Sequence, residues 1–365
     1  ASGYSDALAL TGTDGELQVA GTLTFKGLNS AILDQLTATD SADVFEASGS
    51  GALTAAAINL SGLSRVNGGG GNDKLVAQDT PTMEDGYVRS SGIDFYDLGV
   101  IDANETATLN ATNNNDVIVF DDLGKLTVNG IAIENVTTID ARGGTDDRVT
   151  GMSGQDWQLL SGTSAKNNGI TFLNAETLTA VSGGLLGTTG ADRFTLNTDD
   201  SIDFGSMTIS GMTSLNGNGD ADRLDASAFG AGISLTTTGE LEAGELTITG
   251  ITDITTGKLT GTTGKEVFDL ATGNILTVDT YTGFIFRGVA NLDGNGGSDS
   301  FNSAAGGDWV LAENLASVTL DRESDSDLTI AGVDVFTGGA GVIKGHSSGH
   351  DFVVTADSAV TVDGT

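Results

Sequence analysis

A glycine-rich turn at residues 68–76, GGGGNDKLV, carries the side chains of this sequence that best fit metal chemistry. Asn72 and Asp73 close the turn, and Asp79 follows shortly after them. Carboxylate and amide oxygens are the ligands that Ca²⁺ prefers, and six to eight oxygens surround the ion. The candidate metal site is therefore a calcium-binding turn formed by Asn72, Asp73 and Asp79.

The spacing of similar turns argues for a structural role instead. Residues 68–76 fit the pattern Gly-Gly-x-Gly-x-Asp-x-apolar-x, in which consecutive turns stack and share calcium ions. The next similar stretch, RGGTDDRV, begins only at residue 142, so the two turns cannot share one ion. Asn and Asp also stabilise turns by hydrogen bonding to their own backbone. We therefore expect turn chemistry without a cofactor, with Ca²⁺ at Asn72, Asp73 and Asp79 as the alternative.

Two tryptophans occupy equivalent positions in the chain. Trp157 and Trp309 each follow a turn aspartate, Asp147 and Asp299 respectively, by ten residues. An exposed indole ring can stack on a sugar, so both are candidates for glycan binding. The preferred interpretation is a structural one, in which each ring covers a turn or fills the core.

Catalytic chemistry has little support. The only histidines, His346 and His350, lie in the glycine- and serine-rich stretch GHSSGH and are expected to be solvated turn residues. Cysteine is absent, and no Gly-x-Ser-x-Gly elbow occurs in a strand–helix context. The 50 acidic residues form pairs by chance, so none stands out as a hydrolase pair. We expect no enzyme, and a β-helical polysaccharide-degrading enzyme is the second alternative.

Two alternating motifs organise nearly the whole chain. The first motif reads SADVF, NDVIV, GADRF, GKEVF and GHDFV, and the second reads GGGGNDKL, RGGTDDRV, GNGDADRL and GNGGSDSF. The acids of the first motif are Asp43, Asp116, Asp192, Glu266 and Asp351, and those of the second are Asp73, Asp147, Asp222 and Asp299. Each motif recurs about every 75 residues, so the chain is a repeat array.

The elements that carry these motifs are short strands between glycine turns. Alternating Thr, Val and Ile, as in GELTITGITDITTG (244–257), favour strands, and 54 glycines mark many turns. We predict a right-handed parallel β-helix over residues 1–365, one continuous rod in which each coil stacks on the one before. Less regular loops are expected near 77–100 and 321–332. Tandem β-sandwich repeats are the structural alternative.

Charge and hydropathy limit the partners. The sequence has 50 acidic and 15 basic residues, so electrostatic repulsion disfavours nucleic acid and anionic membrane surfaces as partners. No apolar run approaches the ~18 residues that a membrane helix needs, so no membrane insertion is expected. The chain does not begin with Met, and we interpret it as a fragment of a longer protein.

The repeats resemble those of a known class of secreted protein. The stretches GTTGADRFTLNTDD, ITDITTGKLTGTTGKEVFDL and FRGVANLDGNGGSDSFN are similar to the glycine–aspartate repeats of filamentous-haemagglutinin-type bacterial adhesins, including the biofilm-matrix adhesins of two-partner secretion. The resemblance covers about residues 20–356 and implies a β-helical rod at the bacterial cell surface or outside the cell.

The function that this resemblance implies is structural. The chain would be the stalk or body of an adhesin that joins cells to one another or to a biofilm matrix, with extracellular polysaccharide or a neighbouring cell surface as partner. Lateral self-association of rods stays open. The first alternative is a carbohydrate-binding module of the same fold that uses Trp157 and Trp309.

Overall fold

The protein is an all-β solenoid. The computed structural model describes residues 8–19, 23–104, 108–304, 307–312, 316–322, 327–338, 342–345, 352–356 and 359–362, which form strands and no helix. Parallel pairing between strands far apart in the sequence builds a β-solenoid, which confirms the predicted parallel β-helix rather than the sandwich array. Over the described ranges, no helix has the length and apolar character needed to cross a membrane.

The chain divides into two compact units. Unit 1 comprises residues 1–184 and 205–212, and unit 2 comprises residues 185–204 and 213–365. In each unit the strands belong to two sheets, A and B, and the chain alternates between them. The continuity of residues 1–365 as one rod stays a prediction.

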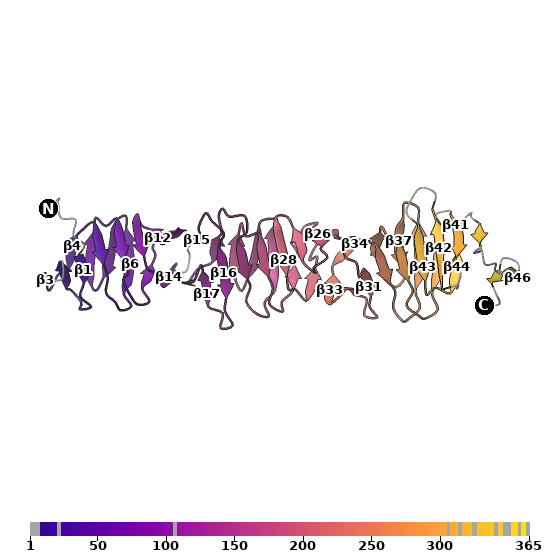
Figure 1. The fold of residues 1–365 in the computed structure, drawn as a ribbon, viewed down its shortest axis with the longest axis horizontal. Helices are drawn as coiled ribbons and strands as arrows, with labels where there is room; N and C mark the ends of the chain where they lie inside the picture. The colour runs from indigo at the N-terminus through magenta and orange to yellow at the C-terminus, as the bar shows by residue number, and fades with distance from the viewer. Residues whose placement is uncertain are drawn as a thin grey trace. The chain divides into compact units, whose positions relative to one another are not determined.

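Unit 1 runs from indigo to magenta in Figure 1. Its sheet A contains β1 (Leu8–Leu10), β2 (Leu17–Val19), β3 (Leu23–Phe25), β5 (Gln35–Thr37), β9 (Arg65–Asn67), β11 (Thr82–Glu84), β12 (Tyr87–Ser90), β13 (Ile93–Tyr96), β15 (Thr108–Asn110), β19 (Thr138–Asp140), β21 (Trp157–Ser161), β22 (Ser164–Asn167) and β23 (Ile170–Leu173). Its sheet B contains β4 (Ser30–Ile32), β6 (Val44–Gly49), β7 (Ala52–Ala55), β8 (Ile58–Ser61), β10 (Lys74–Val76), β14 (Val100–Asp102), β16 (Val117–Phe120), β17 (Leu126–Val128), β18 (Ile131–Glu134), β20 (Arg148–Thr150), β24 (Thr177–Thr179) and β28 (Met207–Ser210).

Unit 2 has the same two kinds of sheet. Its sheet A contains β25 (Leu185–Leu186), β29 (Ser214–Asn216), β31 (Ile233–Leu235), β32 (Leu241–Ala243), β33 (Leu246–Thr249), β35 (Lys258–Thr260), β39 (Asn291–Asp293), β41 (Asp308–Leu311), β42 (Ser317–Asp321), β43 (Leu328–Ala331) and β45 (Ile343–Lys344). Its sheet B contains β26 (Arg193–Leu196), β27 (Ile202–Phe204), β30 (Asp222–Ala226), β34 (Ile251–Thr256), β36 (Val267–Ala271), β37 (Ile275–Val278), β38 (Ile285–Arg287), β40 (Ser300–Ser303) and β44 (Val335–Thr337). A separate hairpin joins β46 (Phe352–Ala356) to β47 (Ala359–Val362).

The repeat of about 75 residues is a set of ten strands. In unit 1, β11, β12 and β13 form an antiparallel meander in sheet A, and β16, β17 and β18 form another in sheet B. Single strands occur between the meanders. β13 pairs in parallel with β9 behind it, whereas β11 pairs with β15 ahead of it. The chain therefore advances to β11 and folds back through β12 to β13 before it continues.

Successive coils stack on one another, as the sequence predicted, but the coils contain meanders that the sequence did not predict. Parallel pairs therefore join strands four places apart in the chain, as in β5 with β9 and β10 with β14. The meanders fill the positions between them. The ten-strand repeat adds five strands to each sheet in unit 1, which corresponds to about 24 Å at ~4.8 Å per strand.

The meanders depend on tight hairpin turns. Asn129–Gly130 and Asn168–Gly169 join consecutive antiparallel strands, and all four residues have a positive φ between 47° and 85°. Asn-Gly is the sequence that best tolerates this turn, because both residues must adopt left-handed backbone. Ala56–Ala57 joins β7 to β8 with φ of 45° and 62°, although alanine is strained in that conformation.

Inward-facing side chains form ladders that run from strand to strand. In unit 1, Phe45 pairs with Leu75 and Leu75 with Ile101, and all three are buried. In unit 2, Phe268 pairs with Phe301 in the same way. The apolar residue after each motif acid is thus a core residue. The first and second motifs occupy neighbouring strands, which explains their alternation along the chain.

The expected loop at 77–100 is corrected. This stretch contains β11, β12 and β13, so it belongs to sheet A rather than to a loop outside the solenoid. Near 321–332 the described residues include the end of β42 and all of β43, while residues 323–326 lie outside the described ranges.

Candidate functional site

The motif acids lie at the turns where the chain passes from sheet A to sheet B, which we call the A-to-B edge. Asp43 directly precedes β6, and Asp73 directly precedes the neighbouring strand β10. The backbone N–H of Asp43 donates a hydrogen bond of 2.9 Å to Oδ1 of Asp73. The glycine-rich turn therefore places the carboxylate of Asp73 beneath the turn that precedes the adjacent strand, β6.

This contact recurs in every pair of first and second motifs that the structure describes. A backbone N–H of the first-motif acid donates to Oδ1 of the second-motif aspartate at 2.7–2.9 Å. The pairs are Asp43 with Asp73, Asp116 with Asp147, Asp192 with Asp222, and Glu266 with Asp299. Sequence reasoning missed this relationship, although the constant separation of 30–33 residues between the acids was its signal.

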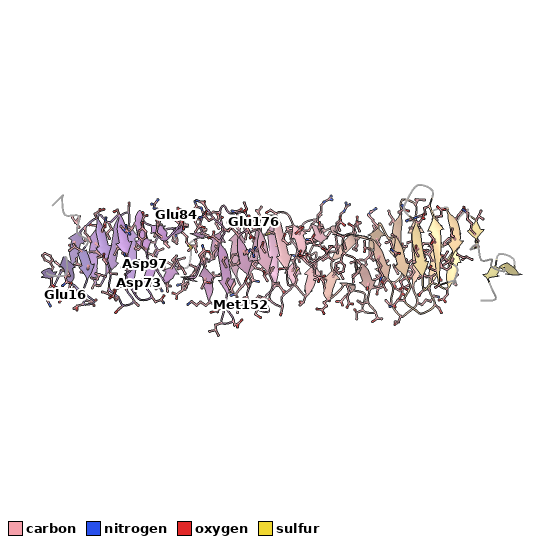
Figure 2. All side chains as sticks on the ribbon, viewed as in Figure 1. Glu16, Asp73, Glu84, Asp97, Met152 and Glu176 are labelled. Atoms are coloured by element: carbon pink, nitrogen blue, oxygen red, sulfur yellow. The ribbon has the colours of Figure 1, made fainter. Side chains whose placement is uncertain are left out.

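The second carboxylate oxygen of these aspartates has an unusual environment. Asp73, Asp147, Asp222 and Asp299 are all fully buried, and Oδ2 of each has no hydrogen-bond partner among the described residues. Burial raises the pKa of each carboxyl, and the nearby carboxylates add to the effect. For Asp73 these neighbours are Asp43 and Asp97, and Figure 2 labels Asp73 and Asp97 near one another.

The first-motif acids are fixed by a second turn contact. Asp116 accepts a hydrogen bond of 2.8 Å from the hydroxyl of Thr112, four residues earlier. Thr188 donates to Asp192 through both its backbone N–H and its hydroxyl, each at 2.7 Å. Thr262 makes the equivalent contacts with Glu266. The threonine and the acid together close the turn, as Asx- and ST-type turns do.

Glycine is required beside several of these carboxylates. A Cβ at Gly217 would lie 2.3 Å from Oδ2 of Asp222 and 2.6 Å from the carbonyl oxygen of Gly250. Gly68 faces Oδ2 of Asp73 in the same manner, at 2.5 Å. A side chain at either position would collide with the carboxylate. The glycines of the motif therefore make room for the buried acid as well as for the turn.

The structure does not bring the proposed calcium ligands together. Asp73 precedes β10 and Asp79 follows its carboxyl end, so the strand separates them. Asp79 accepts hydrogen bonds from the hydroxyl of Ser90 at 2.5 Å and from the N–H of Ser91 at 2.8 Å. Calcium binding at Asn72, Asp73 and Asp79 stays a prediction, which the separation of Asp79 from the other two residues disfavours. In the part of the chain that the structure describes, no three His, Cys, Asp or Glu side chains converge as a metal site.

The buried pair of Asp116 and Asp147 lacks the access that hydrolysis requires. A glycosidase uses two carboxyl groups that flank a substrate bond. Asp147 and Asp116 are both fully buried, and one of them supports the backbone of the other. This arrangement organises turns and presents neither group to a substrate.

The tryptophans belong to the core. Trp157 opens β21 with no exposed surface, packs against Phe172 at 5.6 Å between ring centroids, and donates its indole N–H to the carbonyl oxygen of Thr179 at 3.2 Å. Trp309 in β41 is only 8% exposed and contacts Phe336 at 5.5 Å. This burial favours the structural interpretation of Trp157 and Trp309, and their glycan-stacking role stays a prediction that the burial disfavours.

Other positions named from the sequence lie elsewhere. His346 and His350 fall outside the described residues, as does the first-motif acid Asp351.

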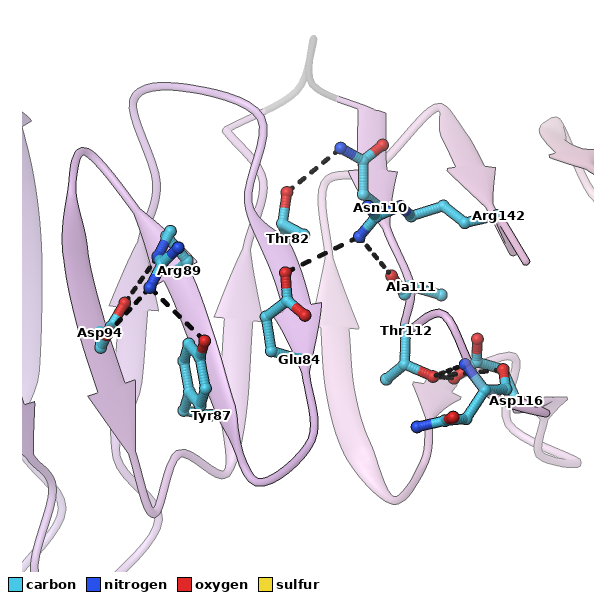
Figure 3. A network of polar contacts seen from close by, with 11 residues as sticks. Thr82, Glu84, Tyr87, Arg89, Asp94, Asn110, Ala111, Thr112, Asp116 and Arg142 are labelled. Carbon is cyan, nitrogen blue, oxygen red and sulfur yellow. Dashed lines mark hydrogen bonds and ion pairs between the residues drawn. The ribbon is translucent and has the colours of Figure 1, made fainter. Parts of the chain in front are cut away.

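A polar network covers the outer face of sheet A around β11–β13. Figure 3 shows Arg89 bonded to Asp94 at 2.7 Å and to the hydroxyl of Tyr87 at 3.4 Å. Beside it, the Arg142 guanidinium lies 3.9 Å from the Glu84 carboxylate. These contacts hold β11 against the strands that follow it. Sequence reasoning had assigned this region to a loop and so missed it.

Comparison with known proteins gives no further assignment: no family model matches the sequence, and no curated protein matches it.

Proposed function

We propose that the chain is a structural segment, the stalk or body of a secreted bacterial adhesin that joins cells to one another or to a biofilm matrix. The observation that carries the proposal is the ten-strand repeat. Each copy extends both sheets by the same number of strands and joins the next through the core ladders, so added repeats extend reach without a new fold.

The surface chemistry supports the same proposal. The formal net charge of −35 keeps such a segment soluble and discourages sticking between its sides. Backbone hydrogen bonds between strands supply stiffness, and the buried acids fix successive A-to-B turns to one another. The resemblance to filamentous-haemagglutinin-type adhesins supplies the cellular setting, and extracellular polysaccharide is the proposed partner.

Deletion of one repeat tests the proposal. An in-frame deletion of residues 223–299 joins the equivalent positions Asp222 and Ser300 within unit 2. We expect a folded protein whose maximum dimension in small-angle scattering falls by about 24 Å, the length of five strands. Non-adherent bacteria that display the full chain on their surface should attach to a polysaccharide matrix. Bacteria that display the deletion variant should attach with a shorter distance between the cell surface and the matrix. An unchanged dimension, or no attachment above the empty display vector, would contradict the proposal.

A further inference from the structure

Asparagine followed by glycine is the dipeptide most prone to spontaneous deamidation, and it recurs along this chain. Asparagine is a chemically labile residue, and a following glycine has no side chain to obstruct the reaction. The asparagines that precede a glycine are Asn67, Asn129, Asn168, Asn216, Asn218 and Asn295. The structure holds them in different ways, so their reactivities should differ.

The reaction needs only the asparagine side chain, the next backbone nitrogen and water. The glycine nitrogen forms a bond to Cγ of the asparagine, and the bond from Cγ to Nδ2 breaks. The proton of the glycine N–H leaves with Nδ2 as ammonia, and a cyclic succinimide remains. Water then opens the ring at one of its two carbonyl carbons to give aspartate or isoaspartate. Contacts that hold the side-chain amide or the glycine N–H in place therefore slow the reaction.

Asn67 and Asn216 are held through both groups. The N–H of Gly68 and that of Gly217 each donate a hydrogen bond of 3.0 Å to a carbonyl oxygen of the neighbouring strand in sheet A. Oδ1 of each asparagine also accepts a backbone N–H at 2.9 Å from the residue two places along. The attacking nitrogen and the side chain that it attacks are thus both fixed.

Asn218 and Asn295 are held through the side-chain amide. Nδ2 of Asn218 donates to the carbonyl oxygen of Gly187 at 3.1 Å, and Nδ2 of Asn295 donates to that of Gly261 at 3.2 Å. Each contact joins the turn to a strand about 30 residues earlier in the chain, so the side chain cannot rotate while the coils stay stacked.

Asn129 is held at both ends of its amide. Nδ2 donates to the fully buried carboxylate of Asp116 at 2.5 Å, and Oδ1 accepts the backbone N–H of Val117 at 2.9 Å. Both hydrogen bonds must break before Cγ can turn toward the nitrogen of Gly130.

Asn168 occupies the same kind of hairpin turn without such contacts. Asn168 and Gly169 have φ of 47° and 81°, close to the values of 50° and 85° in the turn of Asn129 and Gly130. Both residues of the turn at 168–169 are exposed, and the side chain of Asn168 has no hydrogen bond to any residue that the structure describes. A Cβ added at Gly169 would meet nothing within 4 Å, so the space beside the turn is open.

We propose that Asn168 deamidates spontaneously in the folded protein, to a mixture of aspartate and isoaspartate, while the other five Asn-Gly sites keep their amides far longer. The proposal goes beyond the structural function proposed above and does not depend on it.

Isoaspartate at this position would disturb the segment that the turn supports. It lengthens the two-residue turn by one backbone atom, and the register of a hairpin depends on the length of its turn. The preceding residue, Asn167, is 1% exposed and accepts the N–H of Met152 at 2.8 Å. Its Nδ2 donates to the carbonyl oxygens of Gln155 and Asp156. A displaced Asn167 would release residues 152–156 from β22.

Peptide mapping by mass spectrometry tests the site on the full chain. Folded protein is incubated at physiological temperature and mildly alkaline pH, beside a sample unfolded in guanidinium chloride. Asn129 is the matched control, because both sites read Asn-Gly-Ile. In the folded chain we expect Asn168 to lose its amide about tenfold or more faster than Asn129, since two hydrogen bonds protect Asn129. In the unfolded sample the two rates should be similar.

Variants identify the product and its effect. Asn168→Ser should abolish the isoaspartate signal measured with isoaspartyl methyltransferase and a labelled methyl donor. Aged protein that carries isoaspartate at 168 should unfold at a lower denaturant concentration, whereas Asn168→Asp, which adds no backbone atom, should stay close to the unmodified protein. Equal rates at Asn168 and Asn129 in the folded chain, an Asn168 amide that survives while the unfolded chain reacts, or an undiminished signal in Asn168→Ser would each overturn the proposal.

Discussion

The backbone N–H of Asp192 donates a hydrogen bond of 2.8 Å to Oδ1 of Asp222, 30 residues further along the chain. This contact joins two sequence motifs on neighbouring strands, β26 and β30. The same contact occurs in both units, so each second-motif aspartate fixes the turn of the strand beside it. The other carboxylate oxygen, Oδ2, has no hydrogen-bond partner among the residues that the structure describes. Several predictions about stability depend on this difference between the two oxygens.

Replacing Asp222 by Asn should stabilise the protein at pH 7. The amide keeps an oxygen for the Asp192 N–H, places a donor where Oδ2 lacks a partner, and removes a buried charge. We expect a gain of about 1 kcal/mol in the free energy of unfolding, measured in guanidinium chloride. Glu242→Gln, at an exposed residue of β32, is the control for net charge. A loss of stability in Asp222→Asn alone would show that the buried negative charge is required.

The gain from Asp222→Asn should depend on pH. Burial raises the pKa of Asp222 in the folded state, so the folded protein holds this proton more tightly than the unfolded chain, where the pKa is about 3.9. The stabilisation from the protonated form is complete below about pH 3.9 and is lost as the pH rises through the raised pKa. The difference between Asp222→Asn and the unmodified protein should therefore shrink on acidification. A difference that is constant between about pH 4 and 7 would contradict this account.

Gly217→Ala should be destabilising. Its Cβ would lie 2.3 Å from Oδ2 of Asp222 and 2.6 Å from the carbonyl oxygen of Gly250, and backbone cannot move aside easily. We expect a loss of about 1–3 kcal/mol, typical of overpacking in a core. At Gly257 a Cβ meets nothing within 4 Å, so Gly257→Ala should cost little. Similar thermal midpoints for the two variants would show that the turn tolerates the added atom.

The turn between β7 and β8 should gain stability from a change of sequence. Ala56 and Ala57 adopt φ of 45° and 62°, where an Asn-Gly pair is preferred. The double variant Ala56→Asn, Ala57→Gly should raise the free energy of unfolding by about 1 kcal/mol through relief of backbone strain. The backbone contact from Gly15 to Ala56 O is retained. Ala42 lies in a turn and has no positive φ, so Ala42→Gly should leave stability unchanged or lower it. If Ala42→Gly were instead the more stable of the two variants, backbone strain at Ala56 and Ala57 would not explain the result.

Trp157→Ala should cost about 3–5 kcal/mol, because it removes a fully buried ring and its hydrogen bond to Thr179. Trp157→Phe should cost less and leave glycan binding unaltered. Denaturant titration and a glycan array on the same samples would separate the roles. Loss of glycan binding in a stable Trp157→Phe variant would restore the stacking interpretation.

The fold class could be predicted from sequence, but the path of the chain could not. Recurring acids such as Asp73 and Asp147, each followed by a core residue two positions later, indicate stacked turns. The meanders were missed because Ser91–Gly92 and Ala56–Ala57 form tight turns without the usual Asn-Gly signal. Asn129–Gly130 and Asn168–Gly169 did carry that signal, and attention to them would have revealed the hairpins.

The candidate sites were harder to predict, because they depend on which turns meet across the edge. Asn72, Asp73 and Asp79 are close in sequence, but a strand separates Asp79 from the other two. Asp85 and Asn129 are far apart in sequence and line one pocket only because one meander in each sheet folds back to the same edge. No local pattern encodes that meeting.

The order in which the strands join the two sheets determines where the chain can be truncated. Because β11 is placed ahead of β12 and β13, a cut after β13 leaves these three strands of sheet A with no strand of sheet B opposite them. A cut after β20 finishes both sheets of that repeat at the same level. Truncated or extended versions of the protein should therefore end where the last strands of sheets A and B lie opposite one another. A break elsewhere would expose apolar core surface and promote aggregation.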